Sequence, residues 1–252
     1  MILAGGKGLR IPEETSDKPK PMVQIGELPI LTHVMKHYGY YGHREFIICL
    51  GYRGYAIKEY FLNYHLHNND VTINLKDSSY SHANQQDDWR VTLADTGETT
   101  NTAGRLFRVS PYIGYDSTFC MTYGDGVSDV NINDVIDFHK KHGKLATVVA
   151  VNSPSKFGAI TTTTEGLVDY FAEKSKDSTF INGGFFVLQA EVFKYIKDDS
   201  ISWEFDILPQ LVKEKQLMAY RYDGFWKSMD SLKDKMELEE MWNSGKAPWK
   251  IW

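Results

Sequence analysis

The chain has 252 residues, with 28 Lys and Arg against 33 Asp and Glu, so its formal net charge is −5. Hydrophobic residues make up 42% and charged residues 24%, a globular balance that argues against a disordered chain. At about 100–200 residues per domain, this length predicts one large domain or two small ones. The acidic balance argues against nucleic acid as a partner, because it supplies no basic footprint.

No stretch approaches the ~20 apolar residues of a membrane span, and Met1–Ala4 is too short for the apolar core of a signal peptide. We therefore expect no membrane partner. Cys49 and Cys120 lie inside apolar runs, which predicts buried core thiols. Two cysteines in a chain of this length indicate a reducing compartment, so we expect a cytoplasmic protein.

The first half of the chain alternates the patterns of strands and helices. Continuous apolar strands between helices predict a mostly parallel sheet that is covered on both faces. The predicted strands are Met1–Ala4, Glu45–Leu50, Val71–Leu75, Ser117–Tyr123 and Leu145–Val151, and the predicted helices are Pro29–Tyr41, Tyr55–Leu66 and Ile132–His142.

The second half is richer in strand patterns, and we expect it to add a β-rich portion to a single α/β domain over residues 1–252. In the last helix, Ser231 is the predicted N-cap and Asp234 its capping-box partner. The long polar stretch 77–100 is typical of a lid, a hairpin or an interaction arm. The predicted strands are Gly158–Thr163, Leu167–Phe171, Gly184–Leu188 and Leu217–Tyr222, and the predicted helices are Ser202–Glu214 and Ser231–Trp242.

The sequence GGKG over residues 5–8 follows the first strand directly. Glycines at such a strand end let backbone N–H groups approach a phosphate, and open α/β sheets bind ligands at this edge. The run is neither a P-loop nor a dinucleotide fingerprint, because the required third glycine and the G-K-[ST] ending are missing. Alone, it also fits a plain tight turn.

A second basic feature, KPKPM over residues 18–22, strengthens the phosphate interpretation. Pro19 and Pro21 restrict the backbone, so we expect Lys18 and Lys20 to project from a stiff extended segment. Lysine is a compact point charge that suits a phosphate. A solvated basic loop is the alternative, but the nearby glycine turn and Arg10 favour a phosphate site.

Asp125 lies in the sequence YGDG, directly after a buried strand. Mg²⁺ takes one or two protein carboxylates and completes its shell with water and phosphate oxygens, so a second carboxylate is needed. Asp230 is the best candidate, with helix capping as its alternative role, while Asp95 and Asp129 are weaker. No nucleophilic constellation stands out, which favours phosphoryl or nucleotidyl transfer by positioning and charge neutralisation.

Six segments together resemble the sugar-1-phosphate nucleotidyltransferases, and within them the enzymes that use CTP and glucose 1-phosphate. The resemblance spans essentially the whole chain. It implies a Rossmann-like, mixed and mostly parallel sheet flanked by helices, with a β-rich sugar-binding portion. It also implies the reaction of CTP with α-D-glucose 1-phosphate to CDP-glucose and pyrophosphate, with Mg²⁺. The segments are LAGGKGLR, KPKPM, YGDG, FAEKS, INGGFFV and GFWKSMDSLKDK.

The resemblance also implies roles for residues. Residues 1–150 would mainly bind the nucleotide, 151–230 would mainly bind the sugar phosphate, and 77–100 would be an arm in a homo-oligomer, a hexamer. Lys20, Arg10 and Asp125 would be catalytic, and Asp125 and Asp230 would hold the metal. The nucleotide would contact Leu3, Ala4, Gly5, Gly6, Gly8, Leu9, Arg10, Lys20, Gly104, Arg105 and Gly124. The sugar phosphate would contact Tyr123, Gly158, Glu173, Lys174, Asn182 and Gly183.

Three positions depart from the family pattern. Leu9 stands where the family has Thr, Ser175 where it has Pro, and Ala103 where it has Gly. Two rival functions stay open on these grounds. One is a transferase of the same fold with another nucleoside triphosphate or sugar phosphate. The other is a non-catalytic nucleotide-sugar binder, for which Leu9 is the best argument and the retained Lys20 and aspartates the counter-argument.

Overall fold

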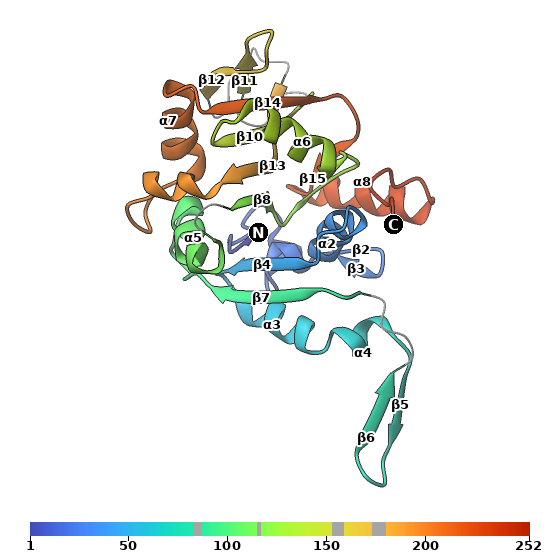
Figure 1. Ribbon diagram of the computed structural model, residues 1–252. Coiled ribbons are helices and arrows are strands. Elements are labelled where there is room, and N and C mark those ends of the chain that lie inside the picture. The colour runs from blue at the N-terminus through green and yellow to red at the C-terminus, as the bar shows by residue number, and fades with distance from the viewer. Residues whose placement is uncertain (83–86, 115–116, 153–158, 173–179) are drawn as a thin grey trace.

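The computed structural model describes residues 1–82, 87–114, 117–152, 159–172 and 180–252. Within them, a nine-stranded mixed sheet forms the centre of the molecule (Figure 1). Its main path runs β12-β11-β13-β8-β1-β4-β7, and β10 pairs with both β13 and β14. These strands are β1 (Ile2–Ala4), β4 (Glu45–Leu50), β7 (Arg90–Asp95), β8 (Thr118–Tyr123), β10 (Ala146–Asn152), β11 (Ala159–Thr162), β12 (Val168–Ala172), β13 (Phe180–Gln189) and β14 (Leu217–Tyr222).

Parallel pairing dominates the half of the sheet that contains the N-terminal strand. β1 pairs in parallel with β4 and β8, and β4 pairs in parallel with β7. The second half is mixed, because β13 runs antiparallel to β8, β10 and β11. The predicted fold class is confirmed.

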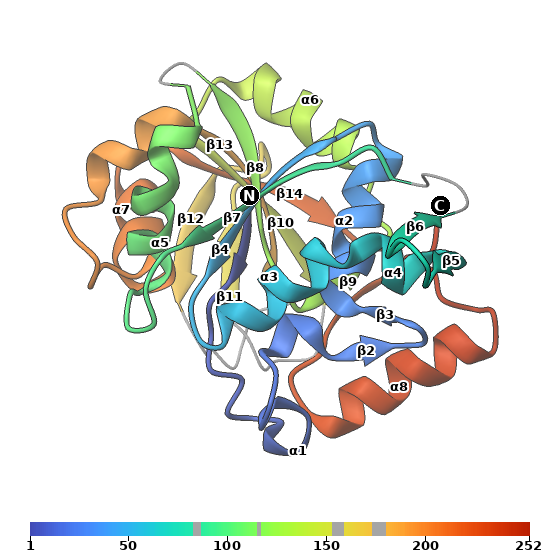
Figure 2. The ribbon, with the colours of Figure 1, turned by 90° about the horizontal axis from the view of Figure 1, so that it is seen from below.

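Helices cover both faces of the sheet, as Figures 1 and 2 show. One apolar core lies under α2, α3, α6 and α8, and a second lies under α5 and α7. The α-helices are α1 (Pro12–Thr15), α2 (Ile30–Tyr40), α3 (Gly54–Leu62), α4 (Tyr64–Asn68), α5 (Thr102–Val109), α6 (Ile132–His142), α7 (Leu208–Lys213) and α8 (Leu232–Asn243). Shorter 3₁₀ or π turns are η1 (Lys20–Met22), η2 (Ser110–Tyr112), η3 (Ala190–Tyr195) and η4 (Trp203–Ile207).

Several predicted elements differ in detail. The helix predicted over 55–66 is split at Asn63 into α3 and α4. The helix predicted over 202–214 opens with the π turn η4, and Pro209 lies in the first turn of α7, where its missing N–H costs nothing. Helix α5 was not predicted from the pattern.

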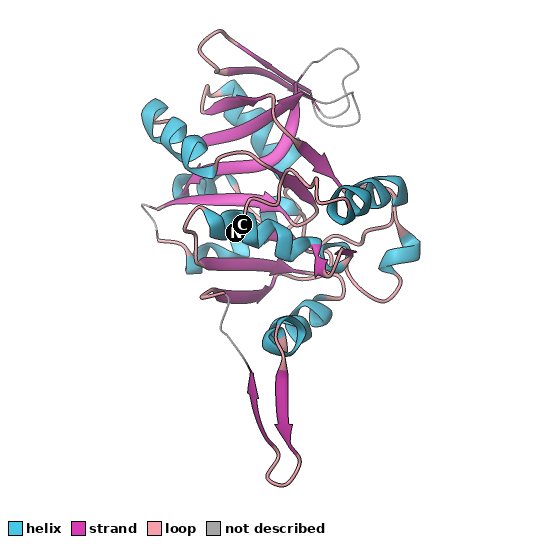
Figure 3. Cartoon of the chain, turned by 90° about the vertical axis from the view of Figure 1, so that its right-hand side faces the viewer, coloured by secondary structure: helices cyan, strands magenta, loops and turns pink. Residues whose placement is uncertain are grey.

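The polar stretch 77–100 contains two different structures. β7 is an edge strand of the main sheet, so residues 90–95 are not part of a protruding arm. The protruding element is the hairpin of β5 (Val71–Asn74) and β6 (Ser79–His82), which extends away from the body in Figures 1 and 3. Within the described residues, the stretch 77–100 thus contains one strand of the hairpin and one edge strand of the sheet.

Two smaller strand pairs complete the fold: β2 (Gln24–Ile25) with β3 (Leu28–Pro29), and β9 (Gly126–Ser128) with β15 (Trp226–Ser228). Cys49 is buried and Cys120 is partly buried, and both are free thiols. Burial raises the pKa of Cys49 to about 12 and that of Cys120 to about 11, which keeps both thiols protonated. No helix among the described residues has the length and apolar composition needed to cross a membrane.

Candidate active site

A cleft of about 630 Å³ opens where β1 and β8 reach their carboxyl ends. This edge is where open α/β sheets bind ligands. The described residues that line the cleft include Leu3, Ala4, Gly5, Gly6, Gly8, Leu9, Arg10, Lys20, Thr102, Arg105, Tyr123, Gly124, Asp125, Asn182, Gly183, Glu204, Trp226, Ser228 and Asp230. Most of the residues that the sequence analysis assigned to substrate therefore meet in one place.

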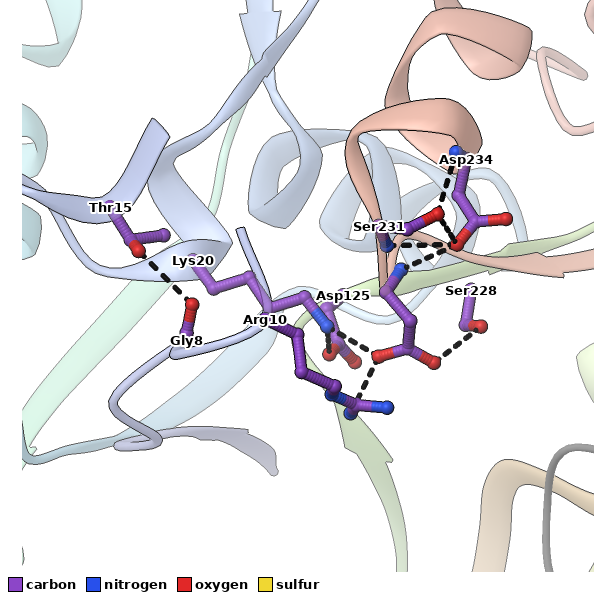
Figure 4. A network of polar contacts seen from close by, with 9 residues as sticks. Gly8, Arg10, Thr15, Lys20, Asp125, Ser228, Ser231 and Asp234 are labelled. Atoms are coloured by element: carbon purple, nitrogen blue, oxygen red, sulfur yellow. Dashed lines mark hydrogen bonds and ion pairs between the residues drawn. The ribbon is translucent and has the colours of Figure 1, made fainter. Parts of the chain in front are cut away.

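The glycine turn after β1 forms one wall of the cleft. Gly8 has a φ of +63°, which favours glycine. The Thr15 hydroxyl donates to the Gly8 carbonyl at 3.0 Å and holds the turn closed (Figure 4). Gly6 is exposed, and nothing within 4 Å would meet a Cβ built there. The backbone at Gly6 is thus open to a ligand.

Lys20 points inward from η1 and is only 7% exposed. Pro19 is extended, as expected, but the chain turns at Lys20, so the predicted extended segment is wrong beyond residue 19. Lys18 is not among the residues that line the cleft, and its Nζ lies 3.9 Å from Glu14 Oε2. The two lysines therefore do not act as a pair, and only Lys20 faces the site.

Asp125 and Asp230 meet in the cleft because two short strands pair beside it. Asp125 lies between β8 and β9, and Asp230 follows β15 by two residues. The antiparallel β9–β15 pair sets Ser228 opposite Gly126, and the Met229 N–H donates to the Asp125 carbonyl at 2.9 Å. The two carboxylates are thereby brought together across a long sequence separation.

The Lys20 ammonium lies between these two carboxylates (Figure 4). Its Nζ is 2.6 Å from Asp125 Oδ2 and 2.7 Å from Asp230 Oδ1, so the two oxygens can be no further apart than the sum of these distances. Burial alone would lower the pKa of Lys20, but the two carboxylates outweigh burial and raise it above its ordinary value. Lys20 is a permanent cation in this state.

Asp230 is not the cap of α8. Ser231 is the N-cap and forms a capping box with Asp234, as predicted, so the Asp230 side chain is available to the cleft. Its Oδ2 accepts from the Ser228 hydroxyl at 2.9 Å, and its Oδ1 lies 2.7 Å from Arg10 Nη2. Asp230 therefore faces two cations and one hydroxyl.

The two carboxylates suit a divalent metal ion. Hard cations prefer carboxylate oxygens, and Mg²⁺ takes one or two of them while keeping positions for water and phosphate. Among the described residues, no group of three or more His, Cys, Asp or Glu forms a metal cage. The donor set thus fits an ion whose remaining ligands come from a bound phosphate and water.

Arg105 is placed differently from a simple nucleotide contact. It lines the cleft but is 5% exposed, and its guanidinium ties together the ends of β1, β4 and β7. A Cβ on Gly5 would lie 2.2 Å from this guanidinium, which explains the glycine. Arg105 donates to Leu50 O, Thr96 Oγ1, Gly97 O, Gly5 O and Glu98 O.

Arg105→Lys is expected to lower the free energy of unfolding by about 3 kcal/mol, since each buried acceptor left unpaired costs about 1–3 kcal/mol. A lysine cannot reproduce the planar fork that reaches all three strand ends. Urea denaturation monitored by circular dichroism measures the change. An unchanged free energy of unfolding would show that these contacts do not hold the strand ends together.

Gly104 does not line the cleft. A Cβ there would lie 2.6 Å from the Asp199 backbone, so this glycine permits a close approach between α5 and the loop at Asp199. The structure thus gives Gly104 a packing role, and its predicted contact with the nucleotide stays a prediction.

Leu9 is 79% exposed at the mouth of the cleft. Its side chain has room to be replaced, and a hydroxyl there would face the place expected for phosphates. We expect Leu9→Thr to raise turnover or leave it unchanged, because a bond to a charged group is worth about 1.5–3 kcal/mol. Steady-state pyrophosphate release measures this. A sharp loss would mean that Leu9 makes a specific contact with substrate.

The residues assigned to the sugar phosphate divide into two groups. Tyr123, Asn182 and Gly183 line the cleft. The strand β13 carries an irregularity opposite Val148 and Ala150, where Gly184 has a φ of +77° and its N–H donates to Asn182 Oδ1 at 2.8 Å. Gly158, Glu173, Lys174 and Ser175 lie outside the described residues.

The cleft residues that the sequence analysis did not assign include Thr102, Glu204 and Trp226. Glu204, in the π turn η4, accepts from the Tyr123 hydroxyl and from Thr102 Oγ1. Burial and this carboxylate raise the pKa of Tyr123 well above its ordinary value, so the phenol stays protonated. Trp226 donates from Nε1 to the Gly183 carbonyl at 2.6 Å. An acidic residue inside the apolar run ISWEFDIL was the available signal for Glu204.

The comparisons with known proteins agree with this geometry. The family described as nucleotidyl transferase matches residues 1–241. The chain belongs to this family. A glucose-1-phosphate cytidylyltransferase of Salmonella typhimurium is 51% identical over 254 aligned residues, covering 100% of this chain and 98% of the relative. The enzyme class predicted from the sequence, a nucleotidyltransferase, is confirmed.

Relatives of this nucleotidyltransferase differ in the base and sugar that their names record. A mannose-1-phosphate guanyltransferase of Saccharomyces cerevisiae is 30% identical, and the alignment covers 93% of this chain and 62% of the relative. A solved UDP-glucose pyrophosphorylase in complex with UDP-glucose superimposes with a TM-score of 0.74 at 17% identity, covering 97% of each chain. At that identity the likeness shows the fold alone.

Proposed function

We propose that this nucleotidyltransferase transfers a cytidylyl group from CTP to α-D-glucose 1-phosphate, giving CDP-glucose and pyrophosphate. The full-length 51% identity to a glucose-1-phosphate cytidylyltransferase carries this choice of base and sugar. The meeting of Lys20, Asp125 and Asp230 in a glycine-lined cleft supports the transfer chemistry.

In the proposed reaction, an oxygen of the sugar phosphate attacks the α-phosphorus of CTP, and the bond to the β,γ-pyrophosphate breaks in line. Two anions must approach each other, so charge neutralisation is the main task of the protein. Lys20 and Arg10 line the cleft beside the glycine turn, as does Lys7 within the turn, and we place Lys20 and Arg10 within reach of a triphosphate held there.

A divalent metal is the expected cofactor, and we propose that it is Mg²⁺. Asp125 and Asp230 would hold it, and when bound it would neutralise phosphate charge. The Ser228 hydroxyl orients Asp230 through Oδ2.

The sugar would lie toward β13. The Asn182 amide offers a donor and an acceptor, as sugar hydroxyls require, although its Oδ1 already accepts from Gly184. Glu173 and Lys174 are proposed as further sugar-phosphate ligands on the resemblance alone. In this arrangement residues 1–150 mainly bind the nucleotide and 151–230 mainly bind the sugar phosphate.

We also propose that the chain forms a homo-oligomer, a hexamer by resemblance, through the β5–β6 hairpin. Ile73 and Tyr80 pair across this hairpin and are 61% and 68% exposed, and Leu75 beside them is 89% exposed. Apolar side chains gathered on a protruding hairpin are typical of a contact surface. We also propose that the protein is cytoplasmic, because Cys49 and Cys120 are both free thiols, as expected in a reducing compartment.

The activity is tested with a panel of nucleoside triphosphates, glucose 1-phosphate and Mg²⁺, followed by pyrophosphate release. We expect CTP to give the fastest turnover at equal concentration. UTP or dTTP turning over as fast as CTP would overturn the choice of base and support the rival transferase. Binding of CTP without pyrophosphate release from any triphosphate would instead support the non-catalytic binder.

A further inference from the structure

The Lys20 ammonium takes the place that a cation shared by both aspartates would take. Its Nζ makes short contacts with Asp125 Oδ2 and Asp230 Oδ1, at 2.6 Å and 2.7 Å. Its side chain is 9% exposed, so solvent screens these contacts poorly. In this state the two carboxylates are neutralised by the protein itself, with Arg10 adding a second positive charge at Asp230.

A metal ion and the Lys20 ammonium cannot share this position. Mg²⁺ binds carboxylate oxygens at about 2.1 Å, which would place it in close contact with an ammonium that already touches the same two oxygens. Two cations at that separation repel strongly in a poorly screened site. The Lys20 ammonium must therefore leave before a metal ion can bind these same two oxygens.

An anion that enters the cleft would give the Lys20 ammonium a new partner. The Lys20 backbone is fixed in η1, but its four-carbon side chain is flexible. The glycine turn lies next to this side chain, because a Cβ built on Gly8 would lie 3.2 Å from Lys20 Cβ. A triphosphate on the glycine turn would attract the ammonium away from the aspartates. The same movement would uncover both carboxylates for a metal.

We propose that Lys20 is a resident counter-cation that couples metal binding to triphosphate binding. Without nucleotide, Lys20 occupies the aspartate pair and keeps divalent metal affinity low. With nucleotide, Lys20 moves to the phosphates and the metal replaces it. This inference rests on the proposed function for the identity of the anion, CTP, and linkage requires the metal to raise CTP affinity by the same factor.

The test is equilibrium dialysis of Mn²⁺ against the protein without nucleotide, with bound Mn²⁺ read by electron paramagnetic resonance. Lys20→Met removes the charge with little change in shape and is expected to bind Mn²⁺ about tenfold or more tightly than the wild type. Lys18→Met is the matched control in the same loop and should bind like the wild type. Equal affinity of Lys20→Met and the wild type would overturn the proposal.

A second variant assigns the gain to this site. Adding Asp125→Asn to Lys20→Met should remove the extra Mn²⁺ affinity, because the shared carboxylate is gone. A gain that survives in the double variant would place the metal elsewhere and overturn the proposal. Thermal unfolding of each variant confirms that the affinities belong to folded protein.

The wild type alone also decides the question if a variant does not fold. At fixed free Mn²⁺, CTP is expected to raise protein-bound Mn²⁺ about tenfold or more, beyond the Mn²⁺ carried by free CTP. Tight Mn²⁺ binding without nucleotide would overturn the counter-cation role, even if CTP binds normally. Failure of CTP to bind at all, measured by calorimetry, would instead overturn both the proposed function and the coupling that rests on it.

Discussion

Asp125→Asn and Asp230→Asn are each expected to lower turnover by at least about 100-fold while leaving the fold intact. Both carboxylates contact the Lys20 ammonium, at the position where we propose that the metal ion binds. An asparagine keeps the shape but loses the charge that a divalent ion needs. Pyrophosphate release under saturating CTP and glucose 1-phosphate measures the loss.

The double variant should be little worse than either single variant, because residues that act as one unit are not additive. Asp134→Asn is a suitable control, since it makes the same chemical change at an exposed position of α6 and should be neutral. Losses that multiply in the double variant would show that the two aspartates do not share one ion.

Lys20→Ala is expected to lower turnover about 100-fold or more. In the proposed reaction Lys20 neutralises the reacting phosphates, and such a cation acts mainly in the transition state, where one such donor is worth roughly 3 kcal/mol. Lys18→Ala is the control, because Lys18 contacts Glu14 outside the cleft and should leave turnover unchanged. Single-turnover measurements separate the chemical step from CTP binding.

Near-normal turnover of Lys20→Ala would return the segment KPKPM to a basic loop without a catalytic role. If Lys20 is also the resident counter-cation, the same substitution should increase metal affinity while it decreases turnover. A simple loss of structure would lower both quantities, so the opposite signs distinguish the two explanations.

Much of the fold could be predicted from local patterns. The apolar runs of β1, β4 and β8 are each followed by a glycine, and α8 carries its capping box in the order Ser231, Asp234. Such signals lie within a few residues of the element they define. The position of Asp125 at a strand end followed from the same local information.

Long-range contacts account for what the sequence could not predict. The inward turn of Lys20 depends on two aspartates 105 and 210 residues away. Arg105 donates to five acceptors at or just after the ends of three strands, which no local spacing records. The short strands β9 and β15 carry too little pattern to be recognised alone, yet their pairing brings Asp230 to Asp125.

The proposed cytidylyl transfer is tested most directly by identifying its products. CTP, α-D-glucose 1-phosphate and Mg²⁺ are incubated with the wild type and followed by phosphorus NMR, with Asp125→Asn as the inactive reference. The account predicts that the CTP and glucose 1-phosphate signals fall together while signals of pyrophosphate and of the two coupled phosphates of CDP-glucose rise equally. Glucose 1-phosphate that stays unconsumed by the wild type, with or without loss of CTP, would contradict it.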